Sequence, residues 1–233
     1  MEISQLLLFL FLILTACREP GVDMITIPKC NLEKPSYARL RIDKLSSGKS
    51  LSDIFTNVEL CYTKTSLIVN FINQGDFIQE NNYETYNSEM WNQTVVELFI
   101  APIALDVIPQ AYVEIEVTPK GVIYASKITN ADGTGKNNQH EFFKCTEIDF
   151  SPRLTSNLNA GHWSAQLTIP FAVIGGEGKS GQRFKANFFR VQMSKIGQGN
   201  CTPETCQYMA WRPTMATPPR FHIPQFFGDF VLQ

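Results

Sequence analysis

The feature that most constrains the fold is an alternation of apolar and polar side chains with a period of two residues. It is clearest over residues 112–117 (YVEIEV), where the apolar side chains would face one side of a strand and Glu114 and Glu116 the other. Residues 118–121 (TPKG) follow as a turn, because proline presets φ and glycine can adopt a positive φ. Residues 122–128 (VIYASKI) then return, so this stretch predicts a β-hairpin.

The same pattern recurs along most of the chain, in short apolar segments between turns rich in glycine, proline and asparagine. The other segments that are typical of strands are residues 58–62, 66–73, 94–100, 162–169, 184–192, 207–211 and 227–232. Many short strands separated by turn signals indicate an antiparallel sandwich rather than alternating strands and helices. The sequence therefore predicts an all-β fold, a jelly-roll-like antiparallel β-sandwich.

The amino terminus carries a hydrophobic leader. Residues 6–14 (LLLFLFLIL) form an uninterrupted apolar run after a short polar start. A membrane-spanning helix needs about 20 such residues, so the run has instead the length of the hydrophobic region of a signal peptide. We expect a signal peptide over residues 1–17, followed by a single exported domain over residues 18–233.

Two routes of maturation remain open at Cys17. Cleavage after Cys17, with Thr15 and Cys17 as the small residues at the site, would release a secreted, extracellular protein. Residues 14–17 (LTAC) also resemble a bacterial lipobox, in which Cys17 would be acylated and would anchor the protein to a bacterial membrane.

Composition excludes several classes of partner. The chain has 20 basic and 22 acidic residues, a net charge of −2, and no basic stripe of the kind that nucleic-acid binding requires. No second apolar run approaches the length of a membrane span. Aromatic residues make up 12% of the chain, which suits a sandwich core or stacking platforms for a ligand.

The six cysteines are disulfide candidates, because an exported protein matures in an oxidising compartment. Cys201 and Cys206 bracket the short loop CTPETC, and we expect them to pair. Removal or acylation of Cys17 leaves an odd number, so one thiol is expected to remain unpaired.

The sequence predicts no metal ion, no cofactor and no catalytic activity. Residues 132–135 (DGTG) match only part of a calcium loop and are interpreted as a turn. His140, His162 and His222 lack the paired spacing of zinc ligands. Glu114 and Glu116 would stand about 7 Å apart on one strand, but adjacent carboxylates on an exposed strand face are common.

A candidate binding platform precedes the segment 94–100. Trp91 offers a flat apolar face and one N–H donor, which suits stacking against a sugar ring. Glu97 follows at an even offset, so it would share a strand face with Trp91 and could hydrogen-bond vicinal hydroxyl groups. Spacing alone favours a simpler interpretation, in which Trp91 is a core residue and Glu97 pairs with an arginine.

Residues 91–100 (WNQTVVELFI) resemble the central motif of the family 9 carbohydrate-binding modules, W-x-x-D-x-V-E-x-F-I, a DOMON-related group of β-sandwich domains. The similarity continues in the order of the family over roughly residues 58–233. The further similar elements are residues 112–121 (YVEIEVTPKG), 163–171 (WSAQLTIPF), 187–190 (NFFR), 210–214 (AWRPT) and 221–228 (FHIPQFFG).

The resemblance implies a sandwich that binds a saccharide or glycan without cleaving it. The end of the saccharide would lie between two aromatic rings, which act as a clamp. Trp91 matches one clamp residue, and Glu97 matches the hydrogen-bonding carboxylate. Phe221 falls where the second aromatic ring would lie, and Trp211 is a further candidate for that role. His222 stands beside Phe221 and is a further candidate binding residue, and we expect it to hydrogen-bond within its own turn.

This chain departs from the family pattern at Glu116, where members hold a basic residue, and at Thr94, which replaces the usual aspartate. Asn92 begins an N-glycosylation sequon, and Asn200 begins another. A glycan on Asn92 would crowd Trp91.

Two other functions remain open. A haem-binding or redox sandwich would use His222 with Met193, Met209 or Met215 as ligands. A structural or adhesion module would have kept the sandwich and lost the ligand.

Overall fold

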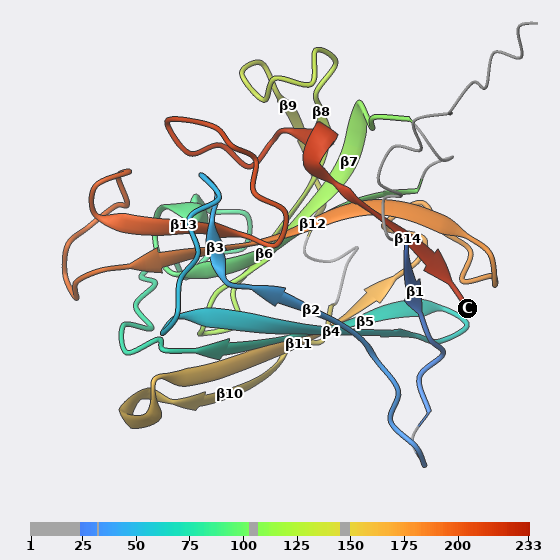
Figure 1. The fold of residues 1–233 in the computed structure, drawn as a ribbon, viewed down its shortest axis with the longest axis horizontal. Helices are drawn as coiled ribbons and strands as arrows, with labels where there is room; N and C mark the ends of the chain where they lie inside the picture. Colours follow the sequence, from blue (N-terminus) through green and yellow to red (C-terminus); the bar gives the residue numbers. More distant parts are fainter. Residues whose placement is uncertain (1–23, 32, 103–106, 145–149) are drawn as a thin grey trace, which may run out of the picture.

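The computed structural model describes residues 24–31, 33–102, 107–144 and 150–233. It confirms the prediction of an all-β sandwich, in which two sheets pack face to face (Figure 1). The pairs between named strands are antiparallel except β1 with β14, which is parallel. No helix in these ranges has the length and apolar character needed to cross a membrane.

The larger sheet has the order β1-β14-β12-β6-β7-β8-β9, with β13 and then β3 added at β12. Its strands are β1 (Ile25–Ile27), β3 (Lys44–Leu45), β6 (Val95–Pro102), β7 (Ala111–Val117), β8 (Ile123–Thr129), β9 (Gln139–Phe142), β12 (Arg183–Met193), β13 (Cys206–Ala210) and β14 (Gly228–Leu232).

The smaller sheet has the order β10-β11-β5-β4-β2. Its strands are β2 (Ala38–Ile42), β4 (Phe55–Tyr62), β5 (Ser66–Gln74), β10 (Arg153–Asn157) and β11 (His162–Pro170). The helical elements are single 3₁₀ turns, namely η1 (Met90–Asn92), η2 (Leu158–Ala160) and η3 (Pro224–Phe226).

The predicted hairpin over residues 112–128 is confirmed. Strand β7 pairs with β8 up to Val117 opposite Ile123, and Gly121 in the turn has a φ of 84°. The strand pair predicted over residues 58–73 is confirmed as β4 and β5. Strands β1, β2, β3, β9 and β10 were not predicted. Nearly all side chains of β9 and β10 are exposed and leave no apolar face to detect, whereas β1 and β3 are very short. Strand β2 does alternate between buried and exposed side chains, so a signal for it was present in the sequence.

The main core lies between the sheets, where Phe71 on β5 meets Phe188 on β12 with ring centroids 6.2 Å apart. A second apolar cluster covers the outer face of the larger sheet, the face turned away from the smaller sheet. Strand β6 contributes to both clusters, with Leu98 in the first and Phe99 in the second. Burial on both faces explains why this strand is almost continuously apolar in sequence.

A fully buried ion pair joins the two sheets. The Nη2 atom of Arg190, on β12, lies 3.3 Å from Oδ2 of Asp76, which follows β5. Nη1 of Arg190 donates to the carbonyl oxygens of Phe55 at 3.0 Å and Gln74 at 3.3 Å, and the indole N–H of Trp163 donates to Asp76. The guanidinium thus contacts backbone of β4 and β5 from the opposite sheet.

We expect Asp76→Ala to lower the free energy of unfolding by about 3–5 kcal/mol, because it leaves a buried guanidinium without its counter-charge. Urea denaturation measures the loss. The matched control is Glu59→Ala, which breaks a solvent-exposed pair with Arg39 (N–O distance 3.0 Å) and should cost less than about 1 kcal/mol. Equal losses in the two variants would contradict a bridging role for the Arg190–Asp76 pair.

Both disulfides of the described residues link neighbouring segments. The predicted pair Cys201–Cys206 is confirmed, and Cys30–Cys61 forms a second disulfide that sequence spacing did not reveal. Cys17 and Cys145 lie outside the described residues, as does the leader, so the expectations about them stay predictions.

Candidate ligand-binding site

A cavity of about 420 Å³ lies over the outer face of the larger sheet. Four of the predicted binding residues line it, namely Trp91, Glu97, Phe221 and His222. Pockets of roughly 300–1,000 Å³ with apolar walls and few polar groups are typical of small-ligand sites.

Trp91 projects from the turn η1, directly before β6, and its side chain is 36% exposed. The side-chain amide of Asn81 holds this turn by donating to the carbonyl oxygens of Met90 and Thr94, both at 3.0 Å. The indole meets the Tyr124 ring edge to face, with centroids 5.4 Å apart. Trp91 lies in this turn and not in β6, so the prediction that it shares a strand face with Glu97 is wrong. The turn nevertheless brings both side chains to the same cavity.

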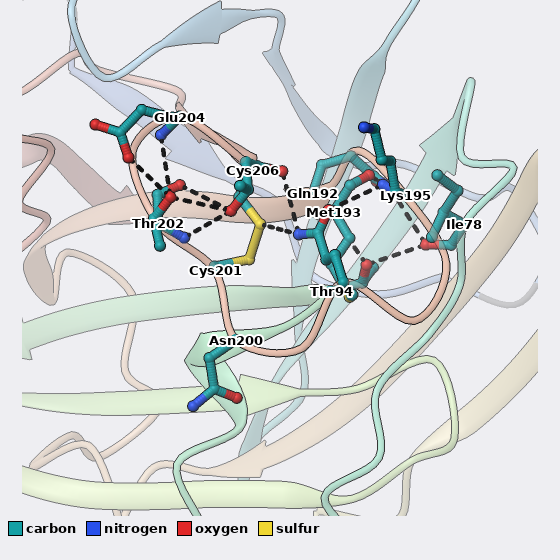
Figure 2. Close-up of a disulfide and its surroundings, with 12 residues drawn as sticks. Ile78, Thr94, Gln192, Met193, Lys195, Asn200, Cys201, Thr202, Glu204 and Cys206 are labelled. Carbon is teal, nitrogen blue, oxygen red and sulfur yellow. Dashed lines mark hydrogen bonds between the residues drawn. A yellow bond between two sulfur atoms is a disulfide. The ribbon is translucent and has the colours of Figure 1, made fainter.

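The loop closed by the Cys201–Cys206 disulfide, drawn in Figure 2, also contacts this turn. The backbone N–H of Cys201 donates to the carbonyl oxygen of Asn92 at 2.7 Å. Asn92 lines the cavity, whereas Asn200 is exposed. A glycan on Asn92 would thus start from the wall of the cavity.

Three glutamates gather on the outer face of the sheet, Glu97 from β6 and Glu114 and Glu116 from β7. One carboxyl oxygen from each lies within 4.8 Å of the others, and the side chains are only 2%, 4% and 0% exposed. We call them the glutamate trio. The expectation that Glu114 and Glu116 occupy an exposed face is wrong, because loops cover this side of the sheet.

The trio lacks the donors that buried carboxylates normally have. Four of its oxygens have no hydrogen-bond donor facing them, one on Glu97, one on Glu114 and both on Glu116. Burial raises the pKa values of Glu97 and Glu116 well above their ordinary value, and neighbouring carboxyls raise them further. Burial also raises the pKa of Glu114 to about 8. The carboxyl groups of the trio therefore hold their protons to a higher pH than solvated glutamates do.

His222 lies over the trio as a neutral side chain. Its Nε2 atom is 3.7 Å from Oε1 of Glu114, and its Nδ1 atom is 2.8 Å from the hydroxyl of Tyr112 on β7. The prediction that the His222 side chain hydrogen-bonds within its own turn is wrong. The chain around His222 crosses the outer face of the sheet, so the imidazole bonds to Tyr112 instead. Burial, with a smaller effect of His140, lowers the pKa of His222 to about 3.

Tyr124, His140 and Tyr208 also line the cavity and were not predicted as site residues. The hairpin register offered a signal for Tyr124, because it lies directly opposite Glu116. His140 meets His222 at a ring distance of 6.0 Å, although sequence spacing had separated them.

The two remaining aromatic candidates differ in position. Phe221 lines the cavity but is only 9% exposed, since one face of its ring stacks on Phe189 with centroids 4.2 Å apart. Trp211 is not among the lining residues and packs towards the main core, against Phe188 and Phe230. The structure does not bring Trp211 to the cavity, because Ala210 faces the outer cluster and strand alternation turns Trp211 to the opposite side.

The methionines of the haem hypothesis are dispersed. Met209 belongs to the main core, Met193 to the outer cluster, and Met215 is exposed. This distribution gives that hypothesis no support.

An antiparallel sandwich whose outer face carries an aromatic-walled cavity with a polar floor is a ligand-binding β-sandwich by fold and site. The chain belongs to carbohydrate-binding family 9, because the model of that family matches residues 52–232. The resemblance drawn from the sequence motifs is thereby confirmed.

Two solved structures share this fold. The first is a candidate carbohydrate-binding protein from Bacteroides uniformis ATCC 8492, with a TM-score of 0.66 and 15% identity over 90% of this chain and 99% of that one. The second is a family 9 carbohydrate-binding module from Caldicellulosiruptor kristjanssonii in complex with cellotriose, with a TM-score of 0.60 and 10% identity over 91% and 94% of the two chains.

One relative is similar in sequence along nearly the whole chain. It is an extracellular protein of Arthroderma benhamiae, 28% identical in an alignment of 222 residues that covers 92% of this chain and 93% of the relative.

The trio predicts a distinctive dependence of stability on pH. A carboxyl whose pKa is raised by folding takes up a proton when the chain folds, so stability falls as pH rises from its ordinary value of 4.5 through the folded value. His222 acts in the opposite direction, but only below its ordinary value of 6.5. Between about pH 6.5 and 8 the carboxyl effect remains, at about 1.4 kcal/mol per pH unit for each proton.

We therefore expect Glu116→Gln, which cannot ionise, to flatten the fall in unfolding free energy between pH 6.5 and 8. Urea denaturation at several pH values measures the slope. Glu59→Gln, at a partly exposed surface position, is the control and should keep the slope of the parent protein. An unchanged slope in Glu116→Gln would show that Glu116 is ionised in the folded state.

Proposed function

We propose that this protein is an exported, non-catalytic module that binds the end of a saccharide in the cavity beside Trp91. The observation that carries the proposal is the convergence of Trp91, Glu97 and Phe221 on one cavity, in a chain that belongs to a carbohydrate-binding family. The family member from Caldicellulosiruptor kristjanssonii was solved with cellotriose, which makes a β-linked glucan end a reasonable first ligand to test.

The side chains of the cavity suit a sugar ring. The indole of Trp91 is open enough to stack against the apolar face of a pyranose, while its edge-to-face contact with Tyr124 fixes its orientation. A carboxyl group of Glu97 can donate when protonated and accept when ionised, so it can pair with hydroxyl groups in either state. His222 is neutral and contributes to the opposite wall.

The carboxyl geometry supports binding without hydrolysis. In glycosidases the two catalytic carboxyl groups flank the scissile bond and stand about 5–5.5 Å or 6.5–9.5 Å apart. Here the three carboxyl groups come from the neighbouring strands β6 and β7 and approach within 4.8 Å of one another. They lie side by side on one face of the sheet, with Glu97 and Glu114 at the cavity floor, and do not flank the cavity from two sides.

We expect the parent protein to bind cello-oligosaccharides with micromolar to millimolar affinity in isothermal titration calorimetry, and Trp91→Ala to weaken binding at least about tenfold, because stacking area is lost. Trp211→Phe is the matched control, since Trp211 lies outside the cavity, and should leave affinity unchanged. An unchanged affinity in Trp91→Ala would contradict the proposed site.

A structural or adhesion module without a sugar ligand is a second candidate. The observation that favours it is the sequon at Asn92, because a glycan there would start from the cavity wall. Absence of binding across a glycan panel, with an intact fold, would favour this second function.

We further propose that the protein is secreted after cleavage behind Cys17. The disulfides Cys30–Cys61 and Cys201–Cys206 favour an oxidising compartment, and the relative from Arthroderma benhamiae is described as extracellular.

Mass spectrometry of the mature amino terminus tests this route. We expect the mature chain to begin at Arg18 and to carry no lipid. A chain that begins with a diacylglyceryl Cys17 would instead establish the lipid-anchored alternative.

A further inference from the structure

We propose that the cavity selects saccharides that carry a protonated amino group, and that the ammonium binds between Glu97 and Glu114 with Glu116 behind them. This inference rests on the proposed function and names the class of sugar that the same site prefers. Its basis is the glutamate trio, which places more acceptor capacity at the cavity floor than hydroxyl recognition requires.

The spacing of the trio fits an ammonium group. An ammonium has three N–H donors and forms charge-assisted hydrogen bonds of about 2.8 Å to carboxylates, so tetrahedrally placed acceptors stand about 4.6 Å apart. The trio offers oxygens that all lie within 4.8 Å of one another. Glu97 and Glu114 line the cavity and can contact a ligand directly, whereas Glu116 lies behind them.

The acceptor oxygens are unused by the protein itself. Four oxygens of the trio accept no hydrogen bond from a residue outside the trio, and Glu116 is completely buried. In the described ranges no lysine or arginine forms an ion pair with the trio. A buried acceptor without a partner is costly, so a ligand that brings both donors and positive charge gains more here than a neutral hydroxyl group.

The walls of the cavity favour an ammonium on a sugar over a bare metal ion. Trp91, Phe99, Tyr124 and Phe221 line the space above the carboxyl groups. Aromatic faces attract cations and stack on sugar rings, whereas calcium requires six to eight oxygen ligands and gains nothing from them. The volume of about 420 Å³ also suits a ring rather than an ion.

Binding an ammonium requires ionised carboxyl groups, so it should release protons from the trio. The other titratable groups around the trio are Tyr112 on β7, Tyr124 on β8, His140 on β9, Tyr208 on β13, and His222, Arg220 and Lys136 on the covering loops. Burial raises the pKa values of the three tyrosines and lowers those of the two histidines, so these five remain neutral near pH 7. Proton release near pH 7 therefore reports on the trio.

Three β-1,4-linked trimers test the inference, because they differ only in the group at position 2. Cellotriose carries a hydroxyl, the N-acetylglucosamine trimer a neutral amide, and the glucosamine trimer an ammonium. In titration calorimetry at pH 6.5, where an amino group with a pKa of about 7.7–8.0 is charged, we expect the glucosamine trimer to bind at least about tenfold tighter than cellotriose. Titration in two buffers of different ionisation heat should show proton release with the glucosamine trimer alone.

The variants Glu114→Gln and Glu116→Gln should each lower the ratio of the glucosamine-trimer affinity to the cellotriose affinity towards one. Thermal unfolding confirms that each variant is folded. Glu59→Gln, outside the cavity, should keep the ratio of the parent protein. A preference that persists in both trio variants would overturn the inference.

The remaining outcomes separate this inference from the proposed function. Equal affinity for the three trimers would overturn the ammonium site and leave saccharide binding intact. Binding of none of them would contradict both. A metal ion in the trio would also overturn the ammonium site. In that case calcium chloride would strengthen cellotriose binding and EDTA would abolish it, in the parent protein but not in Glu116→Gln.

Discussion

The buried pair of Arg190 and Asp76 is the interaction on which the arrangement of this sandwich depends. Arg190 extends from the larger sheet into the space between the sheets. Asp76 lies just after the end of β5, at the start of the connecting segment 75–93. Asp76 also accepts hydrogen bonds from Gln192 and from the backbone of Ile78. The pair therefore joins the two layers and fixes the start of the segment that ends at Trp91.

That segment, with the loop closed by the Cys201–Cys206 disulfide, covers the outer face of the larger sheet and changes the chemistry of β6 and β7. Carboxyl groups that would be ionised and solvated on an open sheet are buried without donors, and their pKa values rise. The same covering places Trp91 above them. One packing arrangement thus creates both the aromatic platform and the acidic floor, on which the proposed binding of a saccharide and the proposed selection for an ammonium group both depend.

Much of the fold and part of the site were predictable from local patterns. Strand alternation located most of the strands that bury one or both faces, but β2, which buries one face, was not predicted, nor were β9 and β10, whose side chains are mostly exposed. The family motif identified Trp91, Glu97, Phe221 and His222, which all line the cavity. Two solved structures share the fold at only 15% and 10% sequence identity. This agrees with a fold that depends on the alternation pattern, because that pattern tolerates wide changes in side-chain identity.

By itself the sequence determined the all-β class, the hairpin of β7 and β8, the Cys201–Cys206 pair and the motif around Trp91, because each depends on residues close together in the chain. Only the tertiary structure decided that Glu114 and Glu116 are buried, that His140 meets His222, and that Trp211 turns to the main core. These outcomes depend on which loop covers which face of a sheet. Strand alternation assigns a residue to one of two faces, but the covering segments decide whether that face is solvent, core or binding site.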